Sequence, residues 1–295
     1  MTDDVPEGFD PIYFAHEPWD QRVTEWVRAK GRTFSDGNLR IVSQAISDPD
    51  SGLRAVLNIG VSALLSVLRS GRYRNLYESP VIGGHPRALP PTRREVDDAM
   101  ELTGERTYFA AVALGGAGVR YYGEYCLVLD LDAIDANPRL FDRDSYDILL
   151  PPIGDLVNRD ELISHLRGRW PDDVHAMVLM KVLPDVLQDR QLVTAGTVSD
   201  LVLKDQEFIE VHLCPGDDES GLPRSFGPQE VEELRESPDE VAVATRLRER
   251  EIDGLRLSDV EHEWLLRREA TTRELGRAGI RTRVVAQHGR GYQWK

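Results

Sequence analysis

Apolar residues recur near helical spacing between residues 53 and 70. They are Leu53, Val56, Leu57, Val61, Leu64, Leu65 and Leu68. This spacing predicts an apolar helix, and glycine, found at position 71, often ends helices. The chain then changes abruptly to "RYRNLYE", in which charged and aromatic residues replace the aliphatic ones. The predicted helix therefore leads directly into a segment with different chemistry.

Other stretches have the β-branched and aromatic content of strands. Residues 107–114 and 124–131 are apolar runs separated by the glycine-rich "GGAGVRYYG", which predicts two paired strands joined by a hairpin loop. Residues 192–203 and 207–216 predict two further strands, the second of which ends at a Pro-Gly break. The alternation in residues 280–287 predicts a final strand.

The remaining patterns are helical. Charged helical patterns cover residues 227–251 and 259–279, and residues 173–187 have the apolar content of a buried element. Turn signals within residues 1–50 favour short helices. No internal repeat is present, so we predict one α+β body with a mixed or antiparallel β core and helical N- and C-terminal flanks.

Three regions are expected within this body. Residues 1–52 form an N-terminal helical cap, and residues 53–216 form the α+β core with a ligand cleft. Residues 217–295 form a helical C-terminal region that ends in a strand.

The charge of the chain is unevenly distributed. The formal net charge is −15, which disfavours a protein that coats nucleic acid by general electrostatics. From Trp264 to the end, however, eight Lys or Arg stand against two Glu, a local balance of +6. A local basic site therefore remains compatible with the acidic whole.

Several classes of protein do not fit the sequence. No apolar run approaches the roughly 18 residues of a membrane span, and the first residues have neither the basic start nor the apolar stretch of a signal peptide. We therefore expect a cytoplasmic protein with no membrane partner. Cys126 and Cys214 are the only thiols, and we expect both to be buried and free. No set of residues at ligand spacing predicts a metal site.

Arg72 and Arg74 are candidate phosphate ligands. On a strand, two arginines separated by Tyr73 point to the same face. Guanidinium groups bind phosphate oxygens through two parallel hydrogen bonds and keep their charge at any working pH. A solvated surface segment is the alternative interpretation of this pair.

Glu210 and His212 are candidates for catalysis. On a strand over residues 207–213 they share one face with Phe208, while the other face is mainly apolar and faces the core. A carboxylate and an imidazole side by side could stabilise a cationic transition state or orient a hydroxyl group. A solvated strand face would carry the same residues.

An ordered set of segments resembles an uncharacterised bacterial family, catalogued as a domain of unknown function, number 3626. The segments are "RSGRYRNLYE", "ERTYFAAVALGG", "RYYGEYCLVLD", "EFIEVHLCPGD" and "AGIRTRVVAQHG". Their order and spacing carry the resemblance, which spans roughly residues 53–290.

The same layout is similar to that of ADP-ribosyltransferases. This resemblance implies their fold and NAD as substrate, with Arg72 or Arg74 as the anchor of its ribose or phosphate. It also implies Tyr108 and Tyr77 as NAD-binding residues and Glu210 as the catalytic carboxylate. Glu210 would engage the ribose while nicotinamide leaves and positive charge develops. The acceptor of ADP-ribose would be a protein or a nucleic acid, and the protein a toxin, effector or modification enzyme.

Two other interpretations stay open. A non-catalytic binding protein of the same fold could use its basic C-terminal tail to engage an acidic partner. Hydrolysis of a phosphoester would need a metal-binding cluster of Asp and His, which "DLDAID" alone does not supply.

Overall fold

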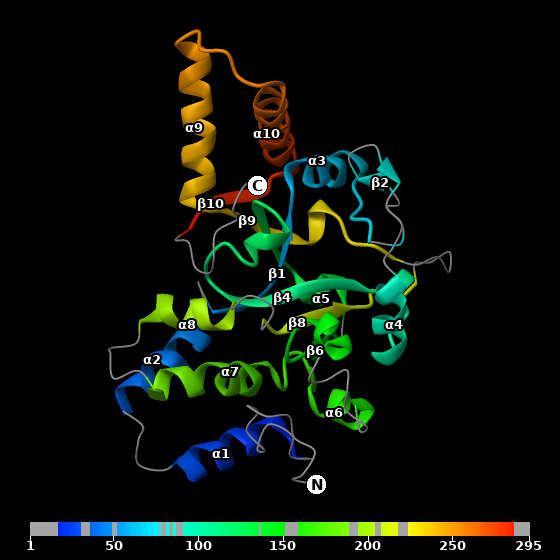
Figure 1. Cartoon of the computed structure of the whole chain (residues 1–295), viewed down its shortest axis with the longest axis vertical. Coiled ribbons are helices and arrows are strands. Elements are labelled where there is room, and N and C mark those ends of the chain that lie inside the picture. The colour runs from blue at the N-terminus through cyan, green and yellow to red at the C-terminus, as the bar shows by residue number, and fades with distance from the viewer. Residues whose placement is uncertain are drawn as a thin grey trace.

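An eight-stranded open sheet organises the computed structural model (Figure 1). The structure describes residues 17–30, 36–48, 52–75, 77, 81–82, 85–86, 91–135, 137–150, 159–188, 194–203, 208–217 and 224–285. Ten α-helices are found within these ranges. The predicted α+β class is therefore confirmed.

The strands of the sheet follow the order β10-β9-β5-β1-β4-β8-β6-β7. Their bounds are Leu53–Ile59 for β1, Tyr108–Leu114 for β4, Tyr125–Leu129 for β5, Arg139–Phe141 for β6, Arg167–Arg169 for β7, Glu210–Leu213 for β8, Val231–Glu236 for β9 and Arg281–Val284 for β10. Neighbouring strands are antiparallel except β9 and β10, which are parallel. A separate short ladder pairs β2 (Val81–Ile82) with β3 (His85–Pro86). The sheet is thus mixed and mostly antiparallel.

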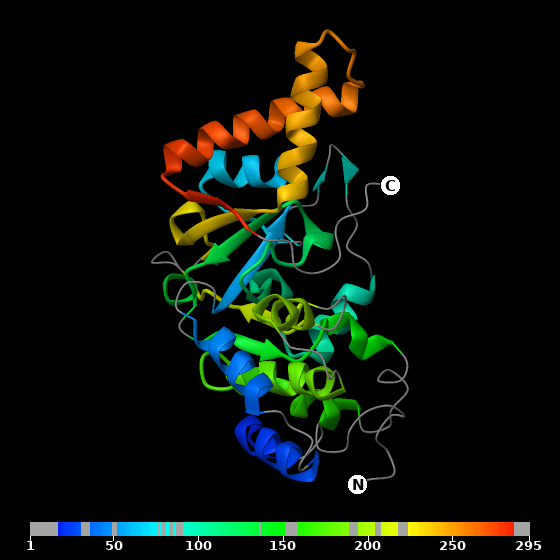
Figure 2. The same cartoon turned by 90° about the vertical axis from the view of Figure 1, so that its left-hand side faces the viewer.

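Several helices lie toward the two ends of the molecule, with α1, α2, α7 and α8 at one end and α3, α9 and α10 at the other (Figure 1). Their bounds are Trp19–Lys30 for α1, Asp36–Ser47 for α2, Val61–Ser70 for α3, Pro91–Ala99 for α4, Leu131–Ile134 for α5, Arg159–His165 for α6, Val174–Gln188 for α7, Ala195–Val202 for α8, Pro238–Ile252 for α9 and Asp259–Ala278 for α10. Helix α7 packs against α1, α2 and α8, whereas α10 packs along α3. Figures 1 and 2 show α9 and α10 extending beyond the opposite end of the molecule from α1. Across the described residues, no helix combines the length and the apolar content that crossing a membrane requires.

The two faces of the sheet differ in chemistry. On the first face, Leu57, Val112 and Leu127 belong to the main apolar core, together with residues of α7 and α8. The second face carries a smaller apolar cluster that includes Val56 and Ala111. The second face also carries buried polar side chains, namely Asn58, Glu210, His212, Glu233 and Arg235.

The predicted helix over residues 53–70 is wrong in its first half. Residues Leu53–Ile59 form β1, and only Val61–Ser70 form a helix, which ends at Gly71 with a φ of 69° as expected. Strand β1 lies between β5 and β4 and is buried on both faces, so apolar residues occupy both of its faces and it lacks the alternation of a half-exposed strand. Such a stretch fits a helical pattern as well as a strand.

Two further assignments are wrong for related reasons. The described part of residues 192–203 forms helix α8, which begins with Thr194 capping the amide of Thr197. Residues 231–236 form strand β9 and not the start of a helix, and the predicted helix is confirmed only for α9. Charged residues in β9 are ion-paired while buried, and a sequence pattern does not reveal such pairing.

The hairpin predicted between residues 107 and 131 is also wrong. Strands β4 and β5 are both confirmed, but β1 lies between them, so the glycine-rich segment crosses over β1. The amide of Asn58 fixes this crossing by donating to the carbonyls of Ala117 and Gly123, at 2.9 and 3.1 Å.

The two thiols differ in environment. Cys126 is buried as expected, and burial raises its pKa to about 12, which makes it unreactive at neutral pH. Cys214 is exposed, contrary to the prediction, because it follows the last residue of β8 and leaves the sheet.

Replacing Gly118 by Ala should destabilise the fold more than replacing Gly279 by Ala. Both glycines have a left-handed backbone, with φ of +66° and +71°. A Cβ at Gly118 would clash with Oδ1 of Asn58 and lie 2.9 Å from Sγ of Cys126, whereas a Cβ at Gly279 meets no atom within 4 Å. We expect losses in the free energy of unfolding of about 3 and about 1 kcal/mol, respectively, measured by urea denaturation. Equal losses would show that the crossing over β1 adapts to a methyl group.

Candidate functional site

Glu210 is held in a buried position on the second face of the sheet. It is 6% exposed, and in the strand register it lies between Ala111 of β4 and Phe141 of β6. Its Oε2 accepts a hydrogen bond from the backbone amide of Ser145 at 3.1 Å and lies 2.9 Å from Nε2 of His212. The predicted pairing of Glu210 with His212 on one face is confirmed, but the face is buried and not solvated.

Asp144 is a second buried carboxylate in electrostatic contact with Glu210. It accepts hydrogen bonds from the backbone amide of Tyr146 at 3.0 Å and from the hydroxyl of Tyr122 at 3.1 Å. Burial, followed by the charge of Glu210, raises the pKa of Asp144 above its ordinary value. Two adjacent carboxylates disfavour each other's ionisation, which makes Asp144 a stronger base than an exposed aspartate.

One guanidinium group faces the carboxylates. Arg93 of α4 is buried, forms an ion pair with Asp97 one turn later, and lies 4.0 Å above the ring of Phe109. Burial opposes its charge, but Asp97 and then Glu210 outweigh burial and raise the pKa of Arg93. The hydroxyl of Tyr77 also hydrogen-bonds to Asp97.

We call this set of residues the Glu210 cluster. It comprises Arg93, Asp97, Tyr122, Asp144, Ser145, Glu210 and His212. Three carboxylates thus stand against one guanidinium, so the cluster favours positive charge. Tyr122 is 52% exposed while its hydroxyl reaches Asp144, so it connects the cluster to solvent. In the described ranges, no group of three or more His, Cys, Asp or Glu is arranged to hold a metal ion.

The structure brings only some of the predicted site residues together. Glu210 lies in the cluster, and Tyr77 reaches it through Asp97. Tyr108 lies in register with Leu213, on the first face of the sheet, and packs against Phe226 with ring centroids 5.4 Å apart. Tyr108 and Glu210 therefore face opposite sides of the sheet.

Arg72 and Arg74 are exposed and lie on an irregular segment, not on the predicted strand. This segment follows α3, and its Tyr73 stacks on Phe226 with ring centroids 4.8 Å apart. The amide of Tyr73 also donates to the carbonyl of Phe226 at 2.7 Å. Asn75 then donates to the carbonyl of Gly104, which directs the segment toward Tyr77.

Most residues of the Glu210 cluster, namely Arg93, Asp97, Tyr122, Asp144 and Ser145, are not among the candidates that the sequence predicts. The spacing of Arg93 and Asp97, four residues apart in a helical stretch, is a signal for an ion pair. Asp144, Ser145 and Tyr122 come from segments between strands, and their approach to Glu210 depends on the order of strands in the sheet.

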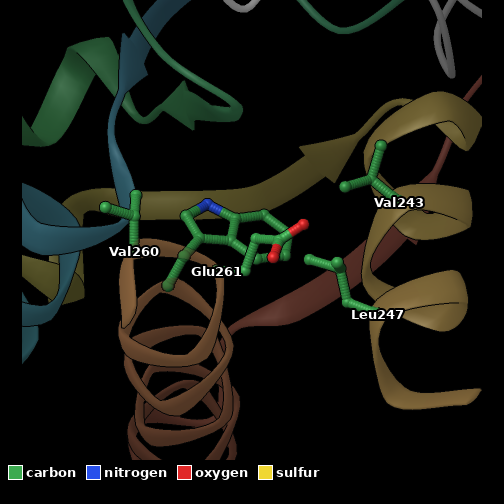
Figure 3. Close-up of a pocket in the computed structure, with 5 residues that line it drawn as sticks. Val243, Leu247, Val260 and Glu261 are labelled. Carbon is green, nitrogen blue, oxygen red and sulfur yellow. The ribbon is translucent and has the colours of Figure 1, made fainter. Parts of the chain in front are cut away.

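A groove of about 260 Å³ lies elsewhere, between α9 and α10 (Figure 3). It is lined by Val243, Leu247, Val260, Glu261 and Trp264. Its one ionisable side chain, Glu261, accepts a hydrogen bond from the backbone amide of Ser258, the N-cap of α10, and pairs with Arg250. This groove therefore has the character of a packing surface and not of a reactive site.

The raised pKa of Asp144 predicts how the stability of an Asp144→Asn variant compares with that of the parent. The ordinary pKa is 3.8, and the folded value lies above it. Protonated Asp144 therefore contributes to the free energy of unfolding in full below pH 3.8. This contribution is lost as the pH rises through the pKa of Asp144 in the folded protein. The parent should lose stability relative to the variant as the pH rises above 3.8, measured by urea unfolding of both proteins.

The pH-dependent difference in stability between proteins with and without Asp144→Asn should become smaller when both also carry Glu210→Gln. The reason is that Glu210 is one cause of the raised pKa of Asp144. A gap that does not vary with pH in either background would contradict a buried, coupled pair of carboxylates.

Compared with family models, curated proteins and solved structures, the chain gives no match. The resemblance to ADP-ribosyltransferases and to the uncharacterised bacterial family therefore stays a prediction.

Proposed function

We propose that the chain binds NAD, cleaves its nicotinamide–ribose bond and transfers ADP-ribose to an acceptor, with Glu210 as the catalytic carboxylate. The observation that carries this proposal is the charge of the Glu210 cluster, in which three carboxylates meet one guanidinium in a buried setting. Such a site stabilises a transition state in which positive charge develops.

The cleaved bond joins C1′ of the ribose to the ring nitrogen of nicotinamide. Its electron pair leaves with nicotinamide and neutralises the ring, while C1′ becomes an oxocarbenium-like centre. Glu210 is fixed by the amide of Ser145 and by His212, so it would need little reorganisation to stabilise that centre. The hydroxyl of Ser145 is buried and has no hydrogen-bond partner in the described structure.

Asp144 is the candidate general base. The acceptor nucleophile attacks C1′ and must lose its proton, and a carboxylate with a raised pKa accepts a proton more readily than an ordinary one. Tyr122 holds Asp144 through its hydroxyl and is itself half exposed, so the acceptor would approach past Tyr122.

The diphosphate of NAD needs cations outside this acidic cluster. Arg72 and Arg74 are exposed on the segment that leads to Tyr77, and they are the candidate anchors for the phosphates or ribose. Tyr108 faces away from Glu210, so we assign it a positioning role: with Phe226 it packs against Tyr73, between the two arginines. We extend the proposal to a fold of the ADP-ribosyltransferase kind and to a protein or nucleic-acid acceptor.

Glu210→Gln should lower the rate of nicotinamide release from NAD by about 100- to 1,000-fold, the effect typical of removing one such electrostatic group. Chromatography of released nicotinamide measures the rate. Glu263→Gln is the matched control, because Glu263 is an exposed carboxylate on α10. Equal rates for the parent and Glu210→Gln would exclude Glu210 from the mechanism, and a parent that releases no nicotinamide would favour a non-catalytic binding protein.

Tyr122→Phe should move the acidic limb of the pH–rate profile to higher pH. The hydrogen bond from Tyr122 lowers the pKa of Asp144, so its loss raises that pKa further. A base must be deprotonated to act, so activity should fall at a higher pH than in the parent. Tyr121→Phe is the matched control, because Tyr121 is 75% exposed and neighbours Tyr122 in the sequence. An unchanged profile would exclude Asp144 as the base.

A further inference from the structure

Strand β10 (Figure 1) is the last strand of the sheet on one side, so one of its two edges has no neighbouring strand within the described residues. The amide of Val285 donates to the carbonyl of Glu236 at 3.0 Å, so residue 285 faces β9. Because successive residues of a strand present their amide and carbonyl groups to opposite sides, Thr282 and Val284 direct theirs away from β9. All four residues of β10 are exposed. The edge therefore offers hydrogen-bonding groups to an added strand.

Three arginines beside this edge share one carboxylate. Glu233 of β9 contacts the guanidinium groups of Arg235, Arg281 and Arg283, at 2.7, 2.9 and 3.0 Å. Burial favours the neutral form of Glu233, but the three guanidinium groups outweigh it and hold its pKa below the ordinary value. The group carries three positive charges and one negative charge, so two further carboxylates would neutralise it.

The arginines of this group are also incompletely paired. Arg235 is 2% exposed, and its Nη1 has no hydrogen-bond partner in the described part of the chain. The side chains of Arg281 and Arg283 are 75% and 42% exposed. The guanidinium groups of Arg281 and Arg283 can therefore bind the carboxylates of a partner while they keep their ion pairs with Glu233.

We propose that the β10 edge binds an extended acidic segment of a partner protein, which adds to the sheet as a ninth strand next to β10. Residues two apart on a strand are separated by roughly 6.6 Å and point to the same face, so acidic residues at alternate positions would match Arg281 and Arg283. A second copy of this chain is a poorer occupant, because pairing β10 with β10 would place the arginines of both copies together. The proposal does not depend on NAD cleavage.

The test uses the full chain and a fluorescein-labelled peptide of about eight residues in which Glu alternates with Val or Thr. Fluorescence anisotropy should detect binding that weakens as salt is added. A peptide with Lys in place of each Glu should not bind. Absence of binding by the acidic peptide up to about 1 mM would overturn the proposal.

Val284→Pro distinguishes strand addition from simple charge attraction. Proline removes only an amide that faces away from β9, so the sheet should keep its ladder while the edge loses a donor. We expect at least a tenfold weaker affinity for the acidic peptide, whereas Val284→Ala should bind like the parent. Equal affinities of the Pro and Ala variants would overturn strand addition.

The double variant Arg281→Gln, Arg283→Gln tests the charges even if Val284→Pro unfolds. It should weaken binding at least tenfold and flatten the salt dependence. Arg277→Gln is the matched control, because Arg277 is 73% exposed and pairs with Glu274 on α10. Unchanged binding by the double variant would show that Arg281 and Arg283 do not recognise the peptide.

Discussion

Charged side chains on a buried sheet face need partners that replace water, and this requirement shapes the second face of the sheet. An isolated buried charge costs several kcal/mol, so each such group must have an opposite charge or a hydrogen bond nearby. Glu210 has hydrogen-bond partners in the amide of Ser145 and in His212, and Arg93 of α4 adds an opposite charge. Nearer the opposite edge of the same face, Glu233 forms ion pairs with Arg235 and with Arg281 and Arg283 of β10. The positions of α4, Ser145 and β10 thus all meet the same need.

The two polar groups on this face have opposite character. The Glu210 cluster has an excess of carboxylates, whereas the group around Glu233 has an excess of guanidinium groups. The apolar row Val128–Val56–Ala111 separates them across three strands. Each group therefore keeps its own charge balance, and a ligand of one would not neutralise the other.

The sequence predicted those elements whose surroundings are simple. The apolar runs of β4 and β5, the αL end of α3 at Gly71 and the long charged helix α10 follow from local pattern alone. Strand β1 was mistaken for part of a helix because burial on both faces removes the alternation that identifies a strand. Strand β9 was mistaken for a helix because its charges are paired with residues of α10 and β10, which are distant in sequence.

The candidate site was predictable only in part, for a similar reason. The alternation around Glu210 was enough to place it beside His212. It could not place Tyr108 relative to Glu210, because that relation depends on which residues of β4 and β8 lie in register. Asp144 and Tyr122 approach Glu210 through the sheet order, which places β8 between β4 and β6 and cannot be derived from local pattern.

The connection between the parallel strands β9 and β10 consists of the helices α9 and α10. Parallel neighbours require a crossover, and α9 and α10 supply it as two long helices that turn back at residues 253–258 (Figure 2). Helix α10 is held by α3 and by the sheet, where Arg268 pairs with Glu236, whereas residues 253–256 at the tip of the crossover are exposed. Whole turns could therefore be gained or lost at its tip during evolution while Arg281 stayed opposite Glu233, so the reach of the helical pair is free to vary in length among descendants of this chain.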